Sequence, residues 1–299
     1  MSAAVAVVVN PVKVADADAL KRYVAARTES AGLGEPLWLE TTVSDPGQGM
    51  VAEALRAGVG LVLVCGGDGT VAACAGALAG SEVAMAVIPV GTGNLFARNL
   101  DLPLDPSDAL EVAFGDGRRS IDVLEAGDHR FVVMAGIGFD AALIRDTDEG
   151  LKAKIGWLAY VGGLIRALRG SPHAQFSVSI DGGRIMKRRA VGVLVGNVGD
   201  VQGGMTVLTE AQADDGLLDV IILAPRTMRY WPLLVWQLLR RRAHEGEHAE
   251  VLRGESVQIT VDRDLPVEYD GDLDGEAAEL TVQVRAGALR LCVPADRPG

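Results

Sequence analysis

The feature that most constrains the fold is a series of short aliphatic runs, each followed by a segment with helical spacing. Residues 5–9, 61–65 and 83–89 are continuous apolar runs, the pattern of strands that are buried on both faces. A further strand is predicted at 37–43, and helical spacing occurs at 16–31, 49–57, 70–78 and from about 94. This alternation predicts a parallel sheet covered by helices. Ligands of such sheets bind at the carboxyl ends of the strands.

The pattern changes after about residue 120, where short strands are separated by Gly, Asp and Asn turns. Predicted strands cover 120–126, 130–135, 176–180, 189–195, 218–223, 256–261, 280–284 and 289–293. Many short strands joined by turns are typical of an antiparallel sandwich. Two segments with helical spacing, 151–169 and 227–248, interrupt them. The sequence therefore predicts an α/β domain followed by a β-rich domain.

Composition excludes several classes of protein. Hydrophobic residues make up 49% of the 299 residues, too many for a disordered chain. Lys plus Arg total 28 and Asp plus Glu total 40, so the net charge of 28 − 40 = −12 argues against nucleic-acid binding through bulk charge. No apolar run has the ~18 residues that a spanning helix requires. The odd number of cysteines, with Cys65 in an apolar run, indicates reduced thiols and a cytoplasmic protein.

The strongest local motif is Cys65-Gly66-Gly67-Asp68-Gly69-Thr70, which lies between a predicted strand and a predicted helix. Three glycines allow a tight turn with exposed N–H groups, and the following helix presents the positive end of its dipole. Together these features favour a cradle for phosphate groups. A simple tight turn is the alternative explanation. The motif is not a P-loop, because the chain contains no Gly-Lys pair.

A second glycine-rich turn, Pro89-Val90-Gly91-Thr92-Gly93-Asn94, follows the next predicted strand. Because consecutive parallel strands end at the same edge of a sheet, the two turns are expected to face one crevice. Two such turns beside one another are difficult to explain as connections alone.

Six motifs, taken in order, resemble those of the diacylglycerol kinase catalytic-domain family, which includes bacterial soluble lipid kinases and, more distantly, sphingosine and ceramide kinases. They are Asn10-Pro11, Gly66-Gly67-Asp68-Gly69-Thr70, Gly91-Thr92-Gly93-Asn94, Gly136-Ile137-Gly138-Phe139-Asp140, Asp214-Asp215-Gly216-Leu217-Leu218-Asp219 and Asp270-Gly271-Asp272. The resemblance spans nearly the whole chain. The Gly-Gly-Asp-Gly-Thr motif by itself is also shared with NAD kinases.

This resemblance implies a nucleotide-binding α/β domain over residues 1–125, joined by the C-terminal segment 286–299, and a β-sandwich over 126–285 that carries the lipid site. It implies transfer of the γ-phosphate of ATP, with Mg²⁺, to a lipid hydroxyl. Diacylglycerol is the leading acceptor, and phosphatidylglycerol or a sphingoid base is the alternative.

The resemblance also assigns residues by position. Asp68 would join Asp122 in a network of water and metal beside the phosphates. A structural Mg²⁺ would be held by Asp215 and by backbone carbonyls near Gln212 and Leu217. Residues expected to bind the nucleotide are Asn10, Thr42 (or its neighbour Thr41), Gly66, Gly67, Asp68, Gly69, Thr70, Val71, Ala72, Gly91, Thr92, Gly93 and Asn94.

The general base would come from the last motif, because a lipid hydroxyl needs a carboxylate to receive its proton. Asp272 is the candidate, with Asp270 beside it. The family usually has Glu at the position of Asp272. A second acidic motif, Asp274-Gly275-Glu276, follows closely and is the alternative source of the base.

Other positions also depart from the family pattern. Ala72 and Ala73 stand where Asn and Glu are usual, and Leu95 stands where Asp is often found. These departures keep open a non-catalytic protein that binds nucleotide or lipid. They also weaken the NAD kinase alternative, in which the Asn and Glu contact substrate.

Two segments indicate how a lipid is approached. Residues 226–242 combine Trp231 and Trp236 with leucines and flanking arginines, and residues 151–157 mix apolar and basic side chains. Such segments suit an anionic membrane surface, so peripheral membrane association is predicted. A core helix with snorkelling arginines or a homodimer contact is the alternative.

Two further motifs match other functions in part. Residues 136–141 fit the dinucleotide fingerprint G-x-G-x-x-A, but no acidic residue occurs in 151–172, where the ribose contact is expected. Residues 244–248 match the H-E-x-x-H pattern of zinc proteases. Gly246 within that pattern weakens a helix by about 1 kcal/mol, so a solvated helix end is the preferred interpretation.

Overall fold

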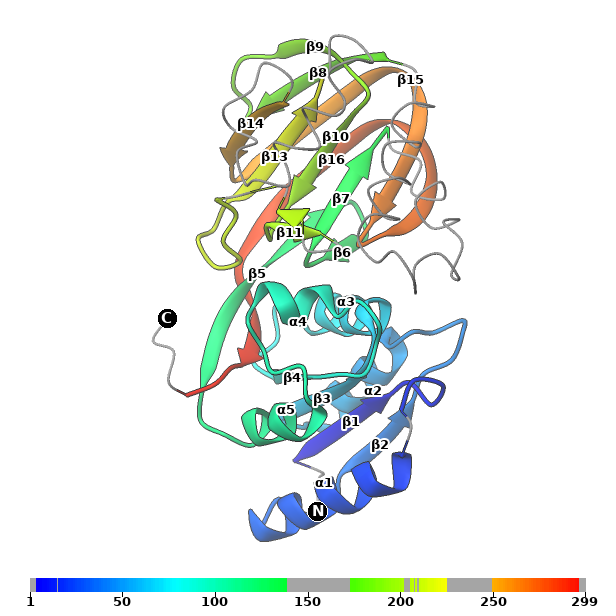
Figure 1. Ribbon diagram of the computed structural model, residues 1–299, viewed down its shortest axis with the longest axis vertical. Coiled ribbons are helices and arrows are strands. Elements are labelled where there is room, and N and C mark those ends of the chain that lie inside the picture. Colours follow the sequence, from blue (N-terminus) through cyan, green and yellow to red (C-terminus); the bar gives the residue numbers. More distant parts are fainter. Residues whose placement is uncertain are drawn as a thin grey trace. The chain divides into compact units, whose positions relative to one another are not determined.

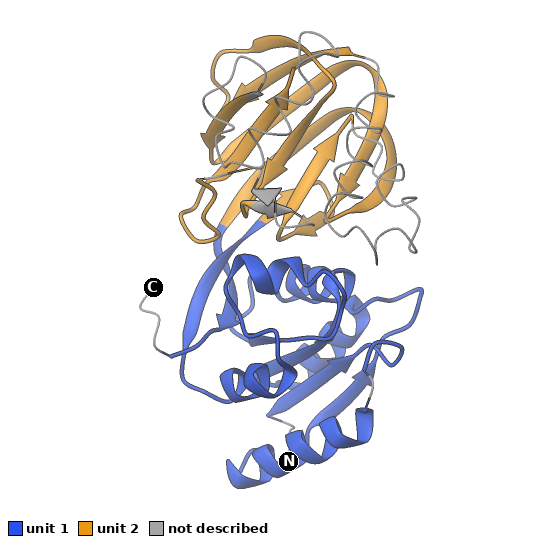
Figure 2. Cartoon of the chain, viewed as in Figure 1, with its two compact units in different colours: residues 1–123, 286–299 blue, residues 124–285 orange. Residues whose placement is uncertain are grey.

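The computed structural model describes residues 4–14, 16–138, 173–201, 205–206, 208, 210–224 and 249–295. The chain forms two compact units, coloured separately in Figure 2: unit 1 comprises residues 1–123 and 286–299, and unit 2 comprises residues 124–285. Two strands, β5 (Arg118–Ala126) and β16 (Asp272–Cys292), pass from one unit to the other. The predicted helical segments at 151–169 and 227–248 lie outside the described residues. No helix in the described ranges is long and apolar enough to cross a membrane.

Unit 1 contains a parallel sheet made of β1 (Val5–Val9), β2 (Leu37–Glu40), β3 (Leu61–Gly66) and β4 (Ala84–Pro89). The strand order is β4-β3-β1-β2, and the C-terminal end of β16 pairs in parallel with β4. Cys65 of β3 is in register with Val9 of β1 and with Ile88 of β4. The strands therefore end together at one edge, as the alternating sequence pattern predicts.

Helices cover both faces of this sheet (Figure 1). Alternate side chains of β1, among them Val5 and Val7, form one apolar cluster with α1 and α5, whereas α2 and α3 lie on the opposite face (Figure 1). The described helices of unit 1 are α1 (Ala17–Ser30), α2 (Gln48–Ala57), α3 (Asp68–Leu78), α4 (Leu95–Asn99) and α5 (Pro106–Ala113).

Helix α5 is too short to be predicted from the spacing of its apolar residues, yet its first turn is well defined. The carboxylate of Asp105 accepts the N–H of Ser107 at 2.8 Å, and Pro106 occupies the first turn. An acidic N-cap followed by proline is a common helix start. The capping residues thus mark a helix that the apolar pattern does not.

Unit 2 is built from antiparallel strands. One set runs β14-β13-β10-β7-β15, and a second runs β9-β8-β15. Besides β5 and β16, the described strands are β6 (His129–Phe131), β7 (Met134–Ile137), β8 (Ala174–Ile180), β9 (Met186–Ala190), β10 (Gly192–Gly196), β11 (Asp200–Val201), β12 (Met205–Thr206), β13 (Leu218–Leu223), β14 (Ala249–Gly254) and β15 (Ser256–Tyr269).

Strand β15 belongs to both sets because its pairing changes along its length. Residues 257–261 pair with β8 and residues 267–269 pair with β7. The register of β15 with β16 shifts between Thr260 and Leu265, in the stretch that separates these two pairings. A bulge of this kind bends a strand and re-aims its side chains. The two sets share one apolar core that includes the fully buried Phe131 and Phe176, and the result is the predicted β-sandwich.

Four predicted strands after residue 120 are divided or joined in the structure. The segment 130–135 is divided into β6 and β7, because the N–H groups of Val132 and Val133 donate to the carboxylate of Asp270 instead of to a neighbouring strand. The segment 189–195 is divided between β9 and β10 at Val191, whose N–H donates to the carbonyl of Leu223 at 2.9 Å. The segments 280–284 and 289–293 are parts of one long strand, β16.

Candidate active site

A row of loops follows the strands at the carboxyl edge of the unit 1 sheet. The N–H of Asn10, after β1, donates to β3 at 2.9 Å, and the N–H of Thr41, after β2, donates to β1 at 2.9 Å. The N–H of Val90, after β4, donates to the carbonyl of Gly66 at 3.2 Å. These hydrogen bonds hold the four loops side by side.

The two glycine-rich loops are in direct backbone contact. A Cβ atom on Gly91 would lie 2.6 Å from the Cα of Gly67, and one on Gly66 would lie 2.5 Å from the Cβ of Thr70. Both distances are too short for real atoms, so packing requires glycine at 66 and 91. Gly69 is different: it is exposed in the first turn of α3, and a Cβ there would meet nothing within 4 Å. The fold itself therefore has no steric need for glycine at 69.

The start of α3 is open to a ligand. Its N-cap is Gly67. Because glycine has no side-chain acceptor, the cap residue leaves the first N–H groups of the helix uncapped. Such groups, together with the helix dipole, attract anions. The open space at Gly69 lies over this same turn, where a phosphate would approach the backbone.

Asp68 joins the two loops. It is the first residue of α3, and its Oδ1 accepts the N–H of Leu95, the first residue of α4, at 2.5 Å. Asp68 thereby caps α4 from outside that helix. The side chain of Leu95, where the family often has Asp, takes no part in this bond.

The side chain of Asn94 forms hydrogen bonds within its own loop, and the side chain of Asp68 caps α4. It has a left-handed backbone with φ of 49°, and its amide side chain exchanges two hydrogen bonds with Gly91, at 2.9 and 3.0 Å. The guanidinium of Arg98 donates to the carbonyl of Gly93 at 2.9 Å. The loop is held rigidly, and Thr92 is left exposed on it.

The structure separates the two threonines that follow β2. Thr41 is buried, whereas Thr42 is exposed. The hydroxyl of Thr42 accepts the N–H of Asp45 at 3.1 Å and lies 3.2 Å from the hydroxyl of Ser44. Thr42 is therefore the member of the pair whose side chain a ligand can contact.

Asp122, predicted to act with Asp68, is almost fully buried in β5. Its Oδ1 accepts the N–H of Gly287 at 2.7 Å. This bond joins β5 to the part of β16 that belongs to unit 1. The structure thus gives Asp122 a part in holding the two strands together.

The predicted acidic motif of unit 2 is the turn of the β15–β16 hairpin. Asp270 and Gly271 have φ values of 47° and 88°, and the flanking Tyr269 and Asp272 are in register. Two residues with positive φ form the turn that fits the twist of a hairpin. The sequence Asp-Gly is the expected choice for such a turn.

The carboxylate of Asp270 is used by the backbone. It accepts the N–H groups of Val132, Val133 and Met134 at 3.1, 2.9 and 2.9 Å. The N–H of Asp270 in turn donates to the carbonyl of Met134 at 2.8 Å. Asp270 therefore fixes the turn that presents the next acid, Asp272, which is exposed at the start of β16.

A histidine that the sequence did not single out lies beside these acids. The Nε2 of His129 is 3.1 Å from Oδ2 of Asp274, and its ring stacks on Tyr269 with centroids 4.5 Å apart. Burial, and to a lesser degree Asp274, raises the pKa of Tyr269. No local pattern marks His129, because its partners come from the β15–β16 hairpin. Asp274 therefore has an imidazole as a neighbour.

An arginine from β14 contacts the predicted magnesium loop of unit 2. Oδ2 of Asp215 is 2.5 Å from the guanidinium of Arg253, and Oδ1 accepts the N–H of Leu217 at 3.0 Å. Arg253 also donates to the carbonyl of Glu210 at 2.8 Å and lies 3.5 Å from the carboxylate of Asp219. Burial raises the pKa of Asp219, and Arg253 opposes that effect.

A magnesium ion at Asp215 stays a prediction. The Asp215 carboxylate has the guanidinium of Arg253 as its positive partner, and Gln212 is exposed. Within the described ranges, no group of three or more His, Cys, Asp or Glu residues is placed to hold a metal ion.

Several predicted features lie elsewhere. The three cysteines are free and buried, as expected for reduced thiols. Gly136 and Ile137 end strand β7, and Gly138 follows it. The rest of that motif, the segments 151–157 and 226–242, and the 244–248 motif lie outside the described residues.

Comparison with known proteins identifies both units. Residues 4–126 match the family described as "Diacylglycerol kinase catalytic domain", and residues 132–293 match the "YegS C-terminal NAD kinase beta sandwich-like domain". A Pseudomonas putida protein named "Probable lipid kinase YegS-like" is 35% identical over 256 residues, which are 84% of this chain and 83% of that protein. A Pseudomonas aeruginosa protein of the same name is 33% identical over 301 residues, covering 96% and 93%.

The fold agrees with this match. The crystal structure of a diacylglycerol kinase from Bacillus anthracis superposes with a TM-score of 0.78 at 24% identity, covering 98% of each chain. Both family matches, and the identity with the Pseudomonas proteins over most of their length, lead to one conclusion. This chain belongs to the YegS-like lipid kinases of the diacylglycerol kinase catalytic-domain family.

Proposed function

We propose that this lipid kinase transfers the γ-phosphate of ATP to diacylglycerol and produces phosphatidic acid. The observation that carries the proposal is the open first turn of α3 beside the two contacting glycine loops. Space over Gly69, uncapped N–H groups and a helix dipole converge there. Such a place suits the phosphates of a nucleotide.

The nucleotide would be bound by the four loops at the carboxyl edge of unit 1. Exposed groups there include Thr42, Gly69 and Thr92, and Asn10 begins the loop after β1. Mg²⁺ would arrive with the nucleotide and neutralise phosphate charge. Phosphoryl transfer passes through a loose transition state, so positioning and charge neutralisation account for most of the rate.

The acceptor hydroxyl would lose its proton to Asp272. The hydroxyl oxygen of the lipid forms a bond to the γ-phosphorus. The bond between that phosphorus and the β–γ bridging oxygen breaks, and ADP leaves. Asp272 is favoured over Asp270 because the Asp270 carboxylate accepts three backbone N–H groups. Asp270 is then a positioning residue for Asp272.

The departures from the family pattern support a second candidate. Ala72 and Ala73 lie in α3 directly after the open turn, and they offer only methyl groups where polar side chains are usual. A protein that binds nucleotide or lipid without transferring phosphate would tolerate this change. Activity measurements separate the two candidates.

The test is transfer of γ-labelled phosphate from ATP, with Mg²⁺, in mixed micelles. The acceptors are diacylglycerol, phosphatidylglycerol, sphingosine and ceramide, with NAD as a soluble control. Three variants are compared with wild type. Asp272→Asn removes the proposed base, and Asp68→Asn removes a charge at the nucleotide while keeping the oxygen that caps α4. Asp264→Asn is the matched control, an exposed acid on β15 outside the hairpin turn.

We expect labelled diacylglycerol with wild type and Asp264→Asn, and a loss of at least about 100-fold with Asp272→Asn. Label in another lipid would identify that lipid as the acceptor. Label in NAD would show the activity of an NAD kinase. Absence of label in every acceptor, with ATP still raising the melting temperature, would favour the non-catalytic protein.

The site of action that we propose is the cytoplasmic surface of an anionic membrane, where the lipid acceptor resides. Residues 226–242 are one candidate for contact with that surface because they combine tryptophan, leucine and arginine. Replacing both Trp231 and Trp236 by Glu is expected to weaken binding to anionic vesicles. Unchanged binding would rule this segment out.

A further inference from the structure

Unit 2 carries a group of positive charges that the candidate active site does not use. Four cations, at 184, 187, 188 and 189, lie on β9 and the turn before it, in a chain with a net charge of −12. In the described part of the chain, β9 pairs with β8 alone and so forms the edge of its sheet. We call residues 184–189 the basic edge.

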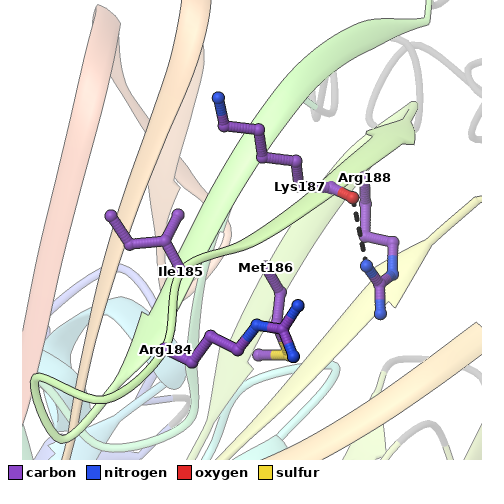
Figure 3. A pocket seen from close by; sticks show the side chains of 5 residues that line it. All are labelled: Arg184, Ile185, Met186, Lys187 and Arg188. Atoms are coloured by element: carbon purple, nitrogen blue, oxygen red, sulfur yellow. Dashed lines mark hydrogen bonds between the residues drawn. The ribbon is translucent and has the colours of Figure 1, made fainter.

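Side chains of the basic edge alternate between two sides of the strand. Ile185 and Lys187 project from one side, and Met186 and Arg188 project from the other (Figure 3). Arg189 falls on the side of Lys187 by the same alternation. Ile185 is 61% exposed, and both Lys187 and Arg189 are exposed. One side of β9 therefore presents an apolar side chain in line with two cations.

Arg188 is the cation of this group that the fold itself uses. Its guanidinium donates to both carboxylate oxygens of Glu250, on β14, at 2.7 and 2.9 Å. Asp181, the acid in the turn between β8 and β9, accepts backbone N–H groups of residues 255 and 256 at 2.9 and 2.7 Å. Glu250 and Asp181 thus both have partners other than Lys187.

The remaining cations keep their charge unpaired within the described ranges. Arg184, Lys187 and Arg189 form no ion pair there. The residues opposite Lys187 and Arg189 on β8 are Ser177 and Gln175, both uncharged. This side of the strand is consequently a local positive surface on an acidic protein.

A hollow of about 630 Å³ adjoins the same segment. It is lined by residues 184–188, so guanidinium groups and the apolar side chains of Ile185 and Met186 share its wall (Figure 3). Cations beside exposed apolar side chains are suited to the headgroup layer of an anionic bilayer, where phosphates and the upper acyl chains meet.

We propose that the basic edge is the surface by which this kinase docks on an anionic phospholipid bilayer. Lys187 and Arg189 contact lipid phosphates, and Ile185 enters the interfacial layer. The inference rests on the proposed function in one respect, that the acceptor is a membrane lipid. An anionic bilayer repels a chain of net charge −12 unless a basic surface faces it. Docking by this edge supplies that surface.

The experiment measures partitioning of the full chain onto vesicles at about 0.1 M salt. One set of vesicles contains equal amounts of phosphatidylglycerol and phosphatidylcholine, and the other contains phosphatidylcholine alone. The double variant Lys187→Gln/Arg189→Gln tests the edge. The matched control, Arg22→Gln/Arg56→Gln, removes the same charge from exposed positions on α1 and α2. Melting temperatures verify that each variant is folded.

Each cation near an anionic surface changes the partition coefficient about fivefold, so the edge variant is expected to bind mixed vesicles about 25-fold more weakly. The control should stay within about twofold of wild type. Ile185→Ser should also weaken binding. Vesicles of phosphatidylcholine alone should bind none of these proteins well, and high salt should abolish binding to the mixed vesicles.

Equal partitioning of wild type and the edge variant would overturn the proposal. The charges would then serve to keep the exposed strand from pairing with another chain, and the edge variant would self-associate. Equal loss in the control would overturn it too, since bulk charge would then explain binding. Phosphate transfer in uncharged micelles, measured in parallel, tests the proposed function separately, and the edge variant should match wild type there.

Discussion

At the residue scale, the glycines of the two loops are present for different physical reasons. Gly66 and Gly91 are required by packing, because a side chain at either would overlap a neighbouring atom. Gly69 lies in a helical turn with open space around it, where alanine is favoured over glycine by up to about 1 kcal/mol. A residue that costs stability without serving the fold points to a ligand.

Exchange of these glycines should separate folding from binding. Gly69→Ala is expected to leave the melting temperature unchanged or raise it, while weakening ATP binding at least about tenfold, since the methyl group occupies space over the open turn. Gly91→Ala is expected to lower the stability by about 1–3 kcal/mol through overpacking. Thermal melts with and without ATP distinguish the two. A Gly69→Ala variant that binds ATP normally would remove the main support for the phosphate site.

The cysteines give a prediction about pH. Burial raises the pKa of Cys65 to about 12, and burial is also the main cause that raises the pKa of Cys292 to about 11. A thiol with a raised pKa stays protonated in the folded chain, so it stabilises the fold below its unfolded pKa, about 8.5. That stabilisation is lost as pH rises through about 9 to 12.

Two measurements check this account. At pH 8 the folded protein should resist iodoacetamide, because the thiolate is the reactive form, whereas the chain in urea should be labelled at three sites. Between pH 8 and 10.5 the free energy of unfolding should fall more for wild type than for Cys65→Ala. Rapid labelling of the folded chain at pH 8 would contradict the buried placement.

The residue scale also shows where sequence alone falls short. The glycine motifs were located correctly because strand, turn and helix signals are local. Asp270 and Asp272 look equivalent in the sequence, and the difference between them depends on residues 132–134, which belong to another hairpin. The environments of His129 and Asp215 likewise depend on partners far along the chain.

At the scale of elements, aliphatic periodicity predicted the parallel strands of unit 1 well, since each is buried on both faces. It was less successful in unit 2. There the N–H groups of Val132 and Val133 donate to Asp270 instead of to a neighbouring strand, which separates β6 from β7. A bulge lets β15 serve two sets of strands. Such features arise from tertiary contacts, which an apolar pattern does not encode.

The loop that joins β12 to β13 provides a prediction about metal removal. Arg253, on β14, neutralises Asp215 and faces the buried Asp219. We therefore expect the melting temperature of wild type, without ATP, to be equal in Mg²⁺ and in EDTA. Arg253→Met keeps the side-chain stem but leaves both acids without a counter-charge. It should lower the stability by roughly 1–3 kcal/mol, less than for a fully buried pair because Arg253 is about one third exposed.

The same variant makes the prediction falsifiable. With the guanidinium gone, Mg²⁺ should raise the melting temperature of Arg253→Met and EDTA should reverse the gain. Lys13→Met, which removes an exposed charge from unit 1, is the control. If EDTA lowers the melting temperature of wild type by several degrees, a bound ion holds the loop and the arginine does not replace it.

At the scale of the whole molecule, unit 1 is discontinuous in sequence. The chain leaves it along β5 and returns along β16, and the last residues of β16 complete the unit 1 sheet beside β4. Leu289, Leu291 and Cys292 are fully buried there. Because Gly287 donates to Asp122 at 2.7 Å, the departing and returning strands are adjacent at the boundary.

This return predicts how a fragment behaves. Residues 1–123 alone lack three buried side chains that each contribute about 1.5–3 kcal/mol, a sum comparable to the whole stability of a domain. The fragment should not melt cooperatively or bind ATP. Appending 286–295 through a short Gly-Ser linker should restore both properties, because the hydrogen bond between Gly287 and Asp122 places the joined ends close together. The same fusion with Leu289→Ser and Leu291→Ser should fail. Cooperative melting of 1–123 by itself, followed by circular dichroism, would show that the returning strand is dispensable for folding of unit 1.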